Sequence, residues 1–239
     1  MNRFARRIGL VGGMAWPSTE LYYRRLNREV ERRLGPGRSA DLVCCSLDFG
    51  PLAQAAEAGR WDEITGTLAD AVRRLAAAGA DFALLAAMTP HRLLPQLQPR
   101  LALPVLHVAA PLARALAQVR RVALLGTSHT AGATFVDEHL PQGASLVRPA
   151  PEVQARLDAI IFGELAQGRA EPASAAWLDS QLQALHAGGC DAALLACTEL
   201  PLLLPQLASP ALPCLDAVAL HAAQAVAIAL GDPPPWTTT

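Results

Sequence analysis

The chain has 239 residues, of which 52% are hydrophobic and 17% are charged, and its formal net charge is −1. This balance gives no electrostatic basis for binding nucleic acid or an anionic membrane, and no apolar run reaches the roughly 18 residues of a membrane span. The first seven residues lead into a strand-like segment without the features of a secretory signal, so we expect a cytoplasmic protein that binds a small molecule.

Strands and helices alternate through the first half of the chain. Residues 8–12 predict a buried strand that ends in a glycine turn, and Pro17 opens a helix with apolar positions at Tyr22, Leu26 and Val30. Further strands are expected at 41–49, up to 87 and at 103–106, with Gly50-Pro51 as a break after the first of them, and helices at 61–78 and from Thr89 onward. This order is typical of a parallel sheet covered on both faces.

The second half begins the same pattern again. We expect a strand and glycine turn at 121–128, a helix at 130–140, a short strand at 144–147, helices at 151–167 and 172–187, a strand up to 197, a short strand at 212–216 and a helix at 217–230. Three consecutive prolines follow, so the tail from 232 to 239 is expected to be frayed.

The two halves also match in sequence. Asp81-x-Ala-Leu-Leu-Ala matches Asp191-x-Ala-Leu-Leu-Ala, and Pro95-Gln-Leu matches Pro205-Gln-Leu. We therefore expect an α/β protein of two pseudo-symmetric lobes, each a parallel sheet flanked by helices. The lobes would be 1–108, completed by the helix at 216–239, and 109–215. Ligands of open α/β sheets bind at the carboxyl ends of the strands, so the active site is expected in the cleft between the lobes.

The repeated strand ends carry different chemistry. Cys197 follows the strand in the second half, whereas Ala87 stands at the equivalent position in the first. Racemisation at a carbon acid needs an acid or base on each face of the carbon, and a tuned thiol can play either part. Hydroxyls at strand-to-helix turns can bind a carboxylate; they are those of Thr89, Thr127, Thr130 and Thr198.

The residue inventory also limits the cofactors. All 20 basic residues other than histidine are arginine, so the chain lacks the lysine that holds pyridoxal phosphate and the lysine of a P-loop. The five cysteines are odd in number and show no metal-ligand spacing. We therefore expect no cofactor, no metal and no disulfide.

Four segments resemble the aspartate/glutamate racemase family, most closely its broad-specificity amino-acid racemase branch. They are Gly-Gly-Met-Ala-Trp-Pro-Ser-Thr at 12–19, Ser-Leu-Asp-Phe at 46–49, Gly-Thr at 126–127 and Cys-Thr-Glu at 197–199. The resemblance extends from residue 8 to about 230. It implies a cofactor-independent, usually dimeric enzyme of two α/β lobes, acting on a small carboxylate or amino acid with one cysteine-type acid/base from each lobe.

The resemblance also implies roles for single residues. Cys197 matches the catalytic cysteine of the second lobe, and Thr198 matches its neighbour that contacts the substrate carboxylate. With the turn residues identified above, the expected substrate-binding set is Gly13, Met14, Met88, Thr89, Thr127, Ser128, Thr130, Thr198 and Glu199. A carboxylate at Glu199 should raise the pKa of the Cys197 thiol and keep it protonated.

The first-lobe motif departs from the family pattern of cysteine or threonine, asparagine, threonine, any residue and histidine. Here these positions read Ala87, Met88, Thr89, Pro90 and His91. Alanine carries no ionisable proton, and the loss of an essential acid/base costs roughly 10²- to 10⁴-fold in rate. We therefore expect one-sided proton transfer by Cys197, with His91 as an auxiliary group or a hydrogen-bond partner at the helix start.

Two alternative functions stay open. A single cysteine could protonate the carbanion left by loss of carbon dioxide, as in the arylmalonate decarboxylases of the same superfamily, and the apolar Met88 suits a substrate with an apolar group. A protein that binds a carboxylate without turning it over is the non-enzymatic alternative, since the partner base is missing beside intact turn hydroxyls.

Overall fold

The computed structural model describes residues 4–237, so the expectations for residues 1–3 and for the end of the tail at 238–239 lie outside the described residues. The chain divides into two compact units. The first unit contains the described residues up to Ala110 and those from His221 onward, and the second is Pro111–Leu220. No helix within 4–237 is long and apolar enough to cross a membrane.

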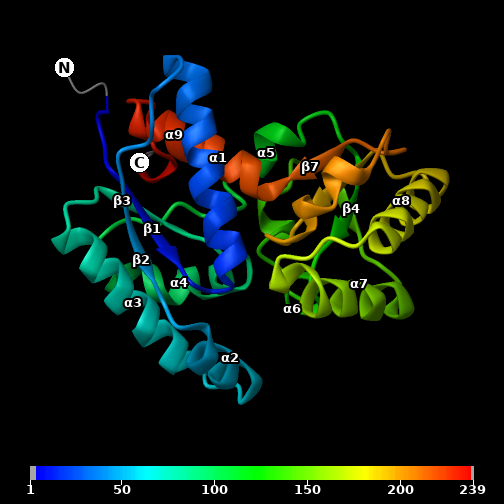
Figure 1. Cartoon of the computed structure of the whole chain (residues 1–239), viewed down its shortest axis with the longest axis horizontal. Coiled ribbons are helices and arrows are strands. Elements are labelled where there is room, and N and C mark those ends of the chain that lie inside the picture. The colour runs from blue at the N-terminus through cyan, green and yellow to red at the C-terminus, as the bar shows by residue number, and fades with distance from the viewer. Residues whose placement is uncertain (1–3, 238–239) are drawn as a thin grey trace. The chain divides into compact units, whose positions relative to one another are not determined.

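The first unit contains a three-stranded parallel sheet in the order β2-β1-β3 (Figure 1). The central strand is buried along its whole length, which explains its continuous apolar sequence. The unit comprises β1 (Ile8–Gly12), α1 (Trp16–Leu34), β2 (Leu42–Ser46), α2 (Phe49–Glu57), α3 (Trp61–Ala77), β3 (Phe82–Leu85), α4 (Leu94–Leu97) and most of α9 (Ala217–Ala229).

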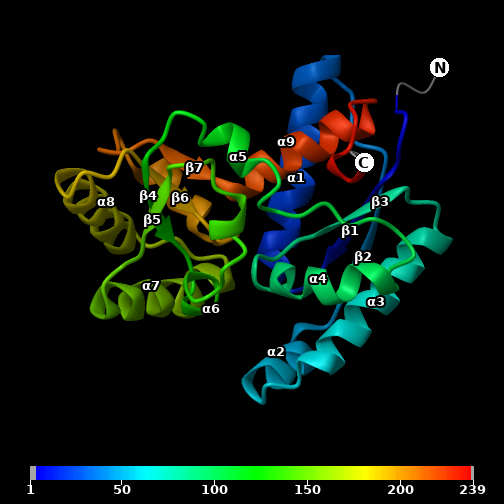
Figure 2. The ribbon, with the colours of Figure 1, turned by 180° about the vertical axis from the view of Figure 1, so that it is seen from behind.

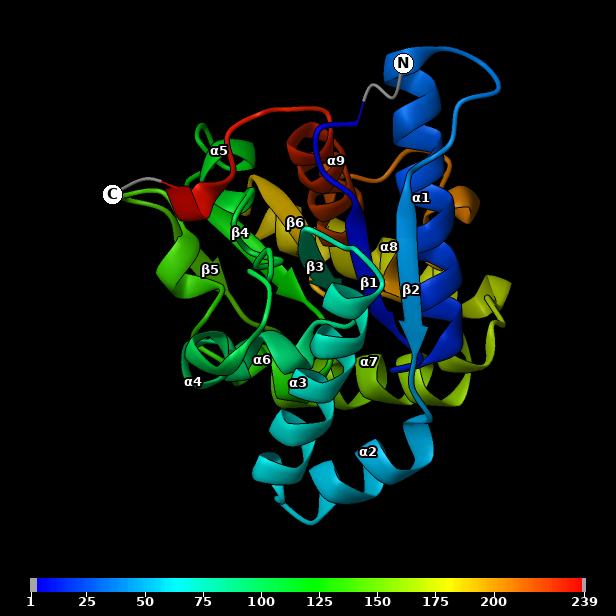
Figure 3. The ribbon, with the colours of Figure 1, turned by 90° about the vertical axis from the view of Figure 1, so that its left-hand side faces the viewer.

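Helices cover both faces of this sheet. The predicted stripe of Tyr22, Leu26 and Val30 on α1 is fully buried. On the other face, α3 packs in an apolar cluster that contains Val11 and Leu85. Figure 3 shows α1 and α3 on opposite sides of β1 and β2. The sandwich expected from the alternating pattern is confirmed.

The strand expected at 103–106 is reduced to one bridge between Ala83 and Val105. The Ala83 N–H donates to the carbonyl of Pro104 at 2.9 Å, and the Leu106 N–H donates to the Ala83 carbonyl at 2.9 Å.

The strand expected at 41–49 ends at Ser46, so it does not continue past Gly50-Pro51, but the sequence did not predict the helix α2 that begins at Phe49. Asp48 caps this helix by accepting a hydrogen bond from the Gly50 N–H at 3.1 Å. Pro51 lies in the first turn, where helix N–H groups have no intrahelical acceptor, so its missing N–H costs nothing.

The tail is also more ordered than expected. Residues Pro235–Thr237 form a 3-10 turn, and Pro234 is buried. The Trp236 ring lies 5.8 Å from that of Phe82, centroid to centroid. The prolines do prevent a helix, but the aromatic contact fixes the described part of the tail on the unit.

The second unit contains a four-stranded parallel sheet in the order β5-β4-β6-β7, and Figure 2 shows β4, β5 and β6 side by side. α7 and α8 pack on the same face of this sheet, in one apolar cluster with the strands. The elements are α5 (Leu112–Ala115), β4 (Arg121–Leu125), α6 (Ser128–Ala131), β5 (Ser145–Val147), α7 (Pro151–Gly163), α8 (Pro172–Ala187), β6 (Ala192–Leu195), β7 (Cys214–Asp216) and the start of α9.

The helix expected at 130–140 is wrong. α6 ends at Ala131 with Gly132 as its C-cap residue, and only a 3-10 turn at Asp137–His139 follows before β5. Glycine is a poor interior helix residue, and a four-residue helix is supported by its cap rather than by length. The helix expected at 151–167 likewise ends at Gly163, with a short 3-10 turn after it.

The repeat seen in the sequence is also present in the backbone hydrogen bonds. Asp81 accepts from the Arg7 N–H at 2.6 Å, and Asp191 accepts from the Arg121 N–H at 2.8 Å. In each unit this aspartate fixes the start of the third strand against the first. The strand ends match too: Ala86 N–H donates to Val11 O at 2.8 Å and Ala196 N–H donates to Leu125 O at 2.7 Å.

Candidate active site

Cys197 lies just beyond the carboxyl end of β6. Its side chain is on the face covered by α7 and α8, and the residue is 3% exposed. The thiol donates to Oε2 of Glu199 at 3.0 Å, and the Thr198 hydroxyl donates to the same oxygen at 2.6 Å. One buried carboxylate oxygen therefore orients both groups.

The surroundings of Cys197 favour the neutral thiol. Burial raises its pKa well above the ordinary value, and the negative charge of Glu199 raises it further. The backbone N–H groups of Glu199 and Leu200 act in the opposite direction but weigh less. The expected effect of Glu199 on the pKa of Cys197 is confirmed, and the side chain is a protonated thiol at neutral pH rather than a preformed thiolate.

Burial alone does not separate a catalyst from a core cysteine, since free cysteines are among the most buried residues. Cys190 in the same unit is 4% exposed, and burial raises its pKa as well. Cys197 differs from Cys190 because its thiol donates a hydrogen bond to a carboxylate that also accepts from the Thr198 hydroxyl. A cysteine that only fills space in the core does not need such a bond.

The glycine turn after β4 lies directly against the Cys197 segment. A Cβ on Gly126 would lie 2.7 Å from the carbonyl oxygen of Ala196, so only glycine fits. Thr127 caps α6 by accepting from the Thr130 N–H at 3.4 Å, and the two hydroxyl oxygens are 3.3 Å apart. The structure thus places Gly126 against Ala196, the residue before Cys197, on the neighbouring strand end. Thr127 is half-buried and Thr130 is buried.

Two residues of α7 that the sequence did not single out hold this turn. The Gln154 amide donates to Gly126 O at 2.9 Å, and the Ser128 N–H donates to Asp158 Oδ1 at 2.9 Å. Gln154 Oε1 is buried and has no hydrogen-bond partner in the described chain. In the sequence, only the spacing of four between Gln154 and Asp158 indicates that the two side chains share one face of a helix. Polar residues on a solvated helix face show the same spacing, so it does not identify a functional role.

In the first unit, Gly13 forms the turn after β1 with φ of 82°. A Cβ there would lie 2.0 Å from the Leu47 carbonyl oxygen. Its N–H donates to the Thr19 hydroxyl at 2.8 Å, and the substrate-binding role expected for Gly13 stays a prediction. Met14 is 7% exposed and packs in the apolar cluster on the α3 face, which is the position of a core residue.

In the first unit, the segment equivalent to residues 197–199 begins with Ala87, which has no ionisable group. Ala87 is half-buried, Met88 is 5% exposed and Thr89 is half-buried at the start of the 3-10 helix Thr89–Leu93. His91 is fully buried, and its Nδ1 accepts a hydrogen bond from the Val108 N–H at 3.3 Å. Of the two roles expected for His91, the structure shows the hydrogen-bond partner.

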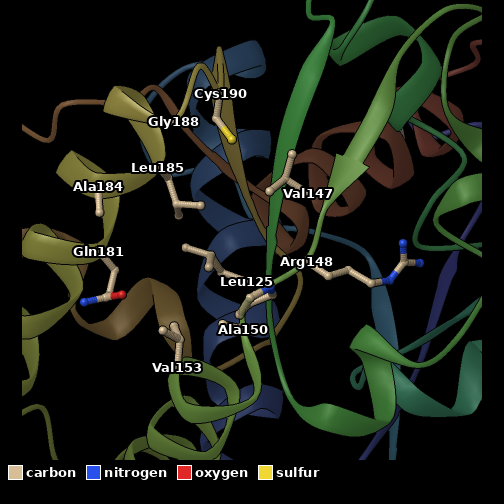
Figure 4. Close-up of a pocket in the computed structure, with 11 residues that line it drawn as sticks. Leu125, Val147, Arg148, Ala150, Val153, Gln181, Ala184, Leu185, Gly188 and Cys190 are labelled. Atoms are coloured by element: carbon tan, nitrogen blue, oxygen red, sulfur yellow. The ribbon is translucent and has the colours of Figure 1, made fainter.

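A cavity of about 190 Å³ lies in the second unit (Figure 4). Its apolar wall includes Leu125, Val147, Val153 and Leu185, with Cys190 at one end, and Cys197 is not among its lining residues. Figure 4 shows the Arg148 side chain pointing away from the other lining side chains. This cavity is therefore distinct from the candidate site. Residues 4–237 contain no group of three or more histidine, cysteine or acidic side chains placed to hold a metal ion.

Comparisons with known proteins agree with the geometry. A family model described as Asp/Glu/Hydantoin racemase matches residues 11–225. The structure of a candidate Asp/Glu racemase from Yersinia pestis is 30% identical, with TM-score 0.82 over 94% of this chain and 99% of that one. An aspartate racemase homologue from Pyrococcus horikoshii is 28% identical, with TM-score 0.77 and the same coverage. An arylmalonate decarboxylase variant, at 19% identity and TM-score 0.53 over 95% and 94% of the two chains, shares the fold alone.

Proposed function

Because the chain belongs to the Asp/Glu/hydantoin racemase family, we propose that it is a cofactor-independent isomerase-type enzyme with Cys197 as its proton donor. Its substrate would be an amino acid or a related small carboxylate, and the reacting atom would be the carbon next to the carboxylate. The observation that carries the proposal is the 3.0 Å hydrogen bond from the buried Cys197 thiol to Glu199. By the same family resemblance we propose a cytoplasmic homodimer.

The proposed step is protonation of a carbanion. Deprotonation next to a carboxylate leaves an enediolate-like charge, which hydroxyls and backbone N–H groups stabilise. The thiolate form of Cys197 first takes the α-proton, so the C–H bond breaks as an S–H bond forms, and that hydrogen exchanges with solvent. The S–H bond then breaks, its proton forms the new C–H bond on the same face, and the thiolate remains beside Glu199. That thiolate is destabilised by burial and by the carboxylate, so it regains a proton readily.

Hydroxyls near Cys197 would bind the substrate carboxylate. Thr198 and Thr127 lie on adjacent turns at the carboxyl end of the sheet, where ligands of such folds collect. The unpartnered Gln154 Oε1 is an acceptor suited to a substrate N–H group. These contacts support a polar amino-acid-like ligand in the second unit.

Ala87 stands where the family pattern has its second acid/base, so the proposed reaction has a single acid/base. Ala87 has no proton to give or take, and Thr89 carries only a neutral hydroxyl. We propose that hydrogen exchange therefore proceeds with retention of configuration rather than with efficient inversion. Two-base racemisation would need an acid/base at residue 87.

Hydrogen exchange in D₂O tests the proposal. The purified protein is incubated with L- and D-aspartate, L- and D-glutamate and a panel of other amino acids, and α-deuteration is followed by NMR. Cys197→Ala should abolish exchange, while Cys190→Ala, which removes an equally buried thiol from the same unit, should leave it. Equal exchange by wild type and Cys197→Ala would refute the assignment of Cys197.

The first-unit position has its own test. Ala87→Cys should give inversion of configuration, measured by chiral chromatography, at a rate well above that of the wild type. Ala87→Ser, which adds a small polar group without an ionisable thiol, is the matched control. Rapid inversion by the wild type would contradict the one-sided mechanism.

A decarboxylase of substituted malonates is the second candidate, supported by the single Cys197 and by the apolar, buried Met88. The C–C bond to the departing carboxylate would break, its electron pair would form the carbanion, and Cys197 would protonate it. Carbon dioxide release that is lost in Cys197→Ala would support this reading. Thermal stabilisation by carboxylates with no turnover of either kind would instead indicate a binding protein.

A further inference from the structure

A cluster of histidine side chains lies inside the first unit, beside the Thr89 turn. His91 and His221 are fully buried, and their ring centroids are 5.6 Å apart. His107 lies 5.0 Å from His91, again between ring centroids. Tyr22 of α1 meets the edge of the His221 ring, with the two rings almost perpendicular at 89°.

The hydrogen bonds of this cluster determine the position of each proton. The Leu106 carbonyl can only accept, so Nε2 of His221 carries the hydrogen of their 3.1 Å contact. Nδ1 of His221 then accepts from the Tyr22 hydroxyl at 2.8 Å. Nδ1 of His91 accepts from the Val108 N–H, so its proton is also on Nε2.

His107 follows the same rule, because its Nδ1 accepts from the Ala109 N–H at 3.0 Å. All three imidazoles are therefore neutral, with the hydrogen on Nε2. Burial, helped by the nearby His107, lowers the pKa of His221 to about 3. The groups that face His221 are Tyr22 from α1, His91 from the Thr89 turn and His107 from the 104–110 segment.

The backbone groups that hydrogen-bond to the three histidines all lie in one segment, residues 106–109. Leu106 and Val108 follow the bridge to β3, and the chain leaves the first unit after Ala110. His221 is the residue at which the chain re-enters the unit, on α9. His91 connects this segment directly to the Thr89 turn, two residues from the candidate substrate hydroxyl.

We propose that Tyr22, His91 and His221 are positioning residues, which fix the 106–108 segment and the Thr89 turn and thereby set substrate affinity. This inference rests on the proposed function, since it takes Thr89 as a substrate-binding residue of the proposed enzyme. None of the three needs to touch the substrate. Their effect passes through the backbone at Leu106 and Val108.

Kinetic constants for exchange distinguish positioning from general stability. Tyr22→Phe removes one neutral hydrogen bond and should raise KM up to roughly tenfold, with kcat changed less than about twofold. Val30→Ala, on the same buried stripe of α1, should lower Tm and leave KM unchanged. His221→Leu should raise KM more than Tyr22→Phe, and His221→Gln, whose amide can still donate to Leu106, should recover part of the affinity.

Equal KM values in wild type, Tyr22→Phe and His221→Leu would overturn the inference, as would a KM increase of the same size in Val30→Ala. A second measurement does not depend on turnover. In protein with ¹⁵N-labelled histidine, the three imidazoles should show the Nε2–H tautomer at neutral pH, and Tyr22→Phe but not Val30→Ala should shift the backbone amide signal of Thr89.

The two proposals fail in different ways. No exchange by the wild type on any substrate removes the proposed function, and the NMR result then decides the positioning network alone. An Nδ1–H tautomer at His221, or an unchanged Thr89 amide in Tyr22→Phe, overturns the network even if exchange is fast.

Discussion

His221 should make the stability of the protein sensitive to mild acid. This side chain is 0% exposed, and both ring nitrogens are engaged, by the Tyr22 hydroxyl and the Leu106 carbonyl. A second proton would have to go on Nδ1. The site is buried, and the two hydrogen-bond partners of the ring, the Tyr22 hydroxyl and the Leu106 carbonyl, carry no negative charge. Burial lowers the pKa from 6.5 to about 3 for this reason.

The sign and size follow from proton linkage. The folded pKa lies below the unfolded one, so the stabilisation is complete above pH 6.5 and is lost as the pH falls toward about 3. The free energy of unfolding should fall by about 1.4 kcal/mol per pH unit within this window. Between pH 7 and pH 5 the loss is about 2 kcal/mol, and it hardly changes for any folded pKa below about 4.

Urea unfolding at several pH values between 7 and 5 measures this loss. His221→Gln should be less stable than wild type at pH 7, but its free energy of unfolding should fall by about 2 kcal/mol less over the same range. Val72→Ala, a core variant on α3, should be destabilised and keep the wild-type dependence on pH. Parallel curves for wild type and His221→Gln, or an NMR titration of His221 near pH 6.5, would refute the reasoning.

Three further predictions test the candidate site and the fold. Glu199→Gln removes the charge beside Cys197, so the thiol pKa should fall, seen as thiolate absorbance appearing at lower pH than in wild type; an unchanged titration would contradict the electrostatic role of Glu199. Gly13→Ala should cost more than the roughly 1–3 kcal/mol of backbone strain, because its Cβ would overlap the Leu47 carbonyl; urea unfolding with wild-type stability would show that the turn relaxes freely. Trp236→Ala should lower stability by about 1–2 kcal/mol, and no change in Tm would show that the tail is not held by its ring.

The strands could be predicted because each is a continuous apolar run with a polar or glycine end. Proline residues predicted the ends of helices and strands less well than the apolar runs predicted the strands. At Gly50-Pro51 it opens a helix, because Asp48 supplies a cap that the dipeptide alone does not reveal. At 232–237 it does block a helix, but the contact of Trp236 with Phe82 joins residues more than 150 positions apart, which no local pattern encodes.

The candidate site divides in the same way. Cys197, Thr198 and Glu199 are neighbours in sequence, so their interaction and its effect on the thiol pKa could be expected. Gln154 and His221 could not, because each acts through a tertiary hydrogen bond. The bond from Tyr22 to His221 spans 199 positions, and nothing in either helix marks it.

The order in which the two units occur along the chain has a consequence for synthesis. The second unit is one uninterrupted segment, Pro111–Leu220, whereas the first waits for α9 before the Tyr22 hydroxyl and the Leu106 carbonyl find their partner on His221. On the ribosome, the lobe that emerges first is thus the last to be completed, in reverse of the usual N-terminal-first sequence. Until residue 221 leaves the exit tunnel, the Tyr22 ring of α1 lacks the His221 ring it packs against, and this is the stage at which a chaperone would bind the nascent first lobe.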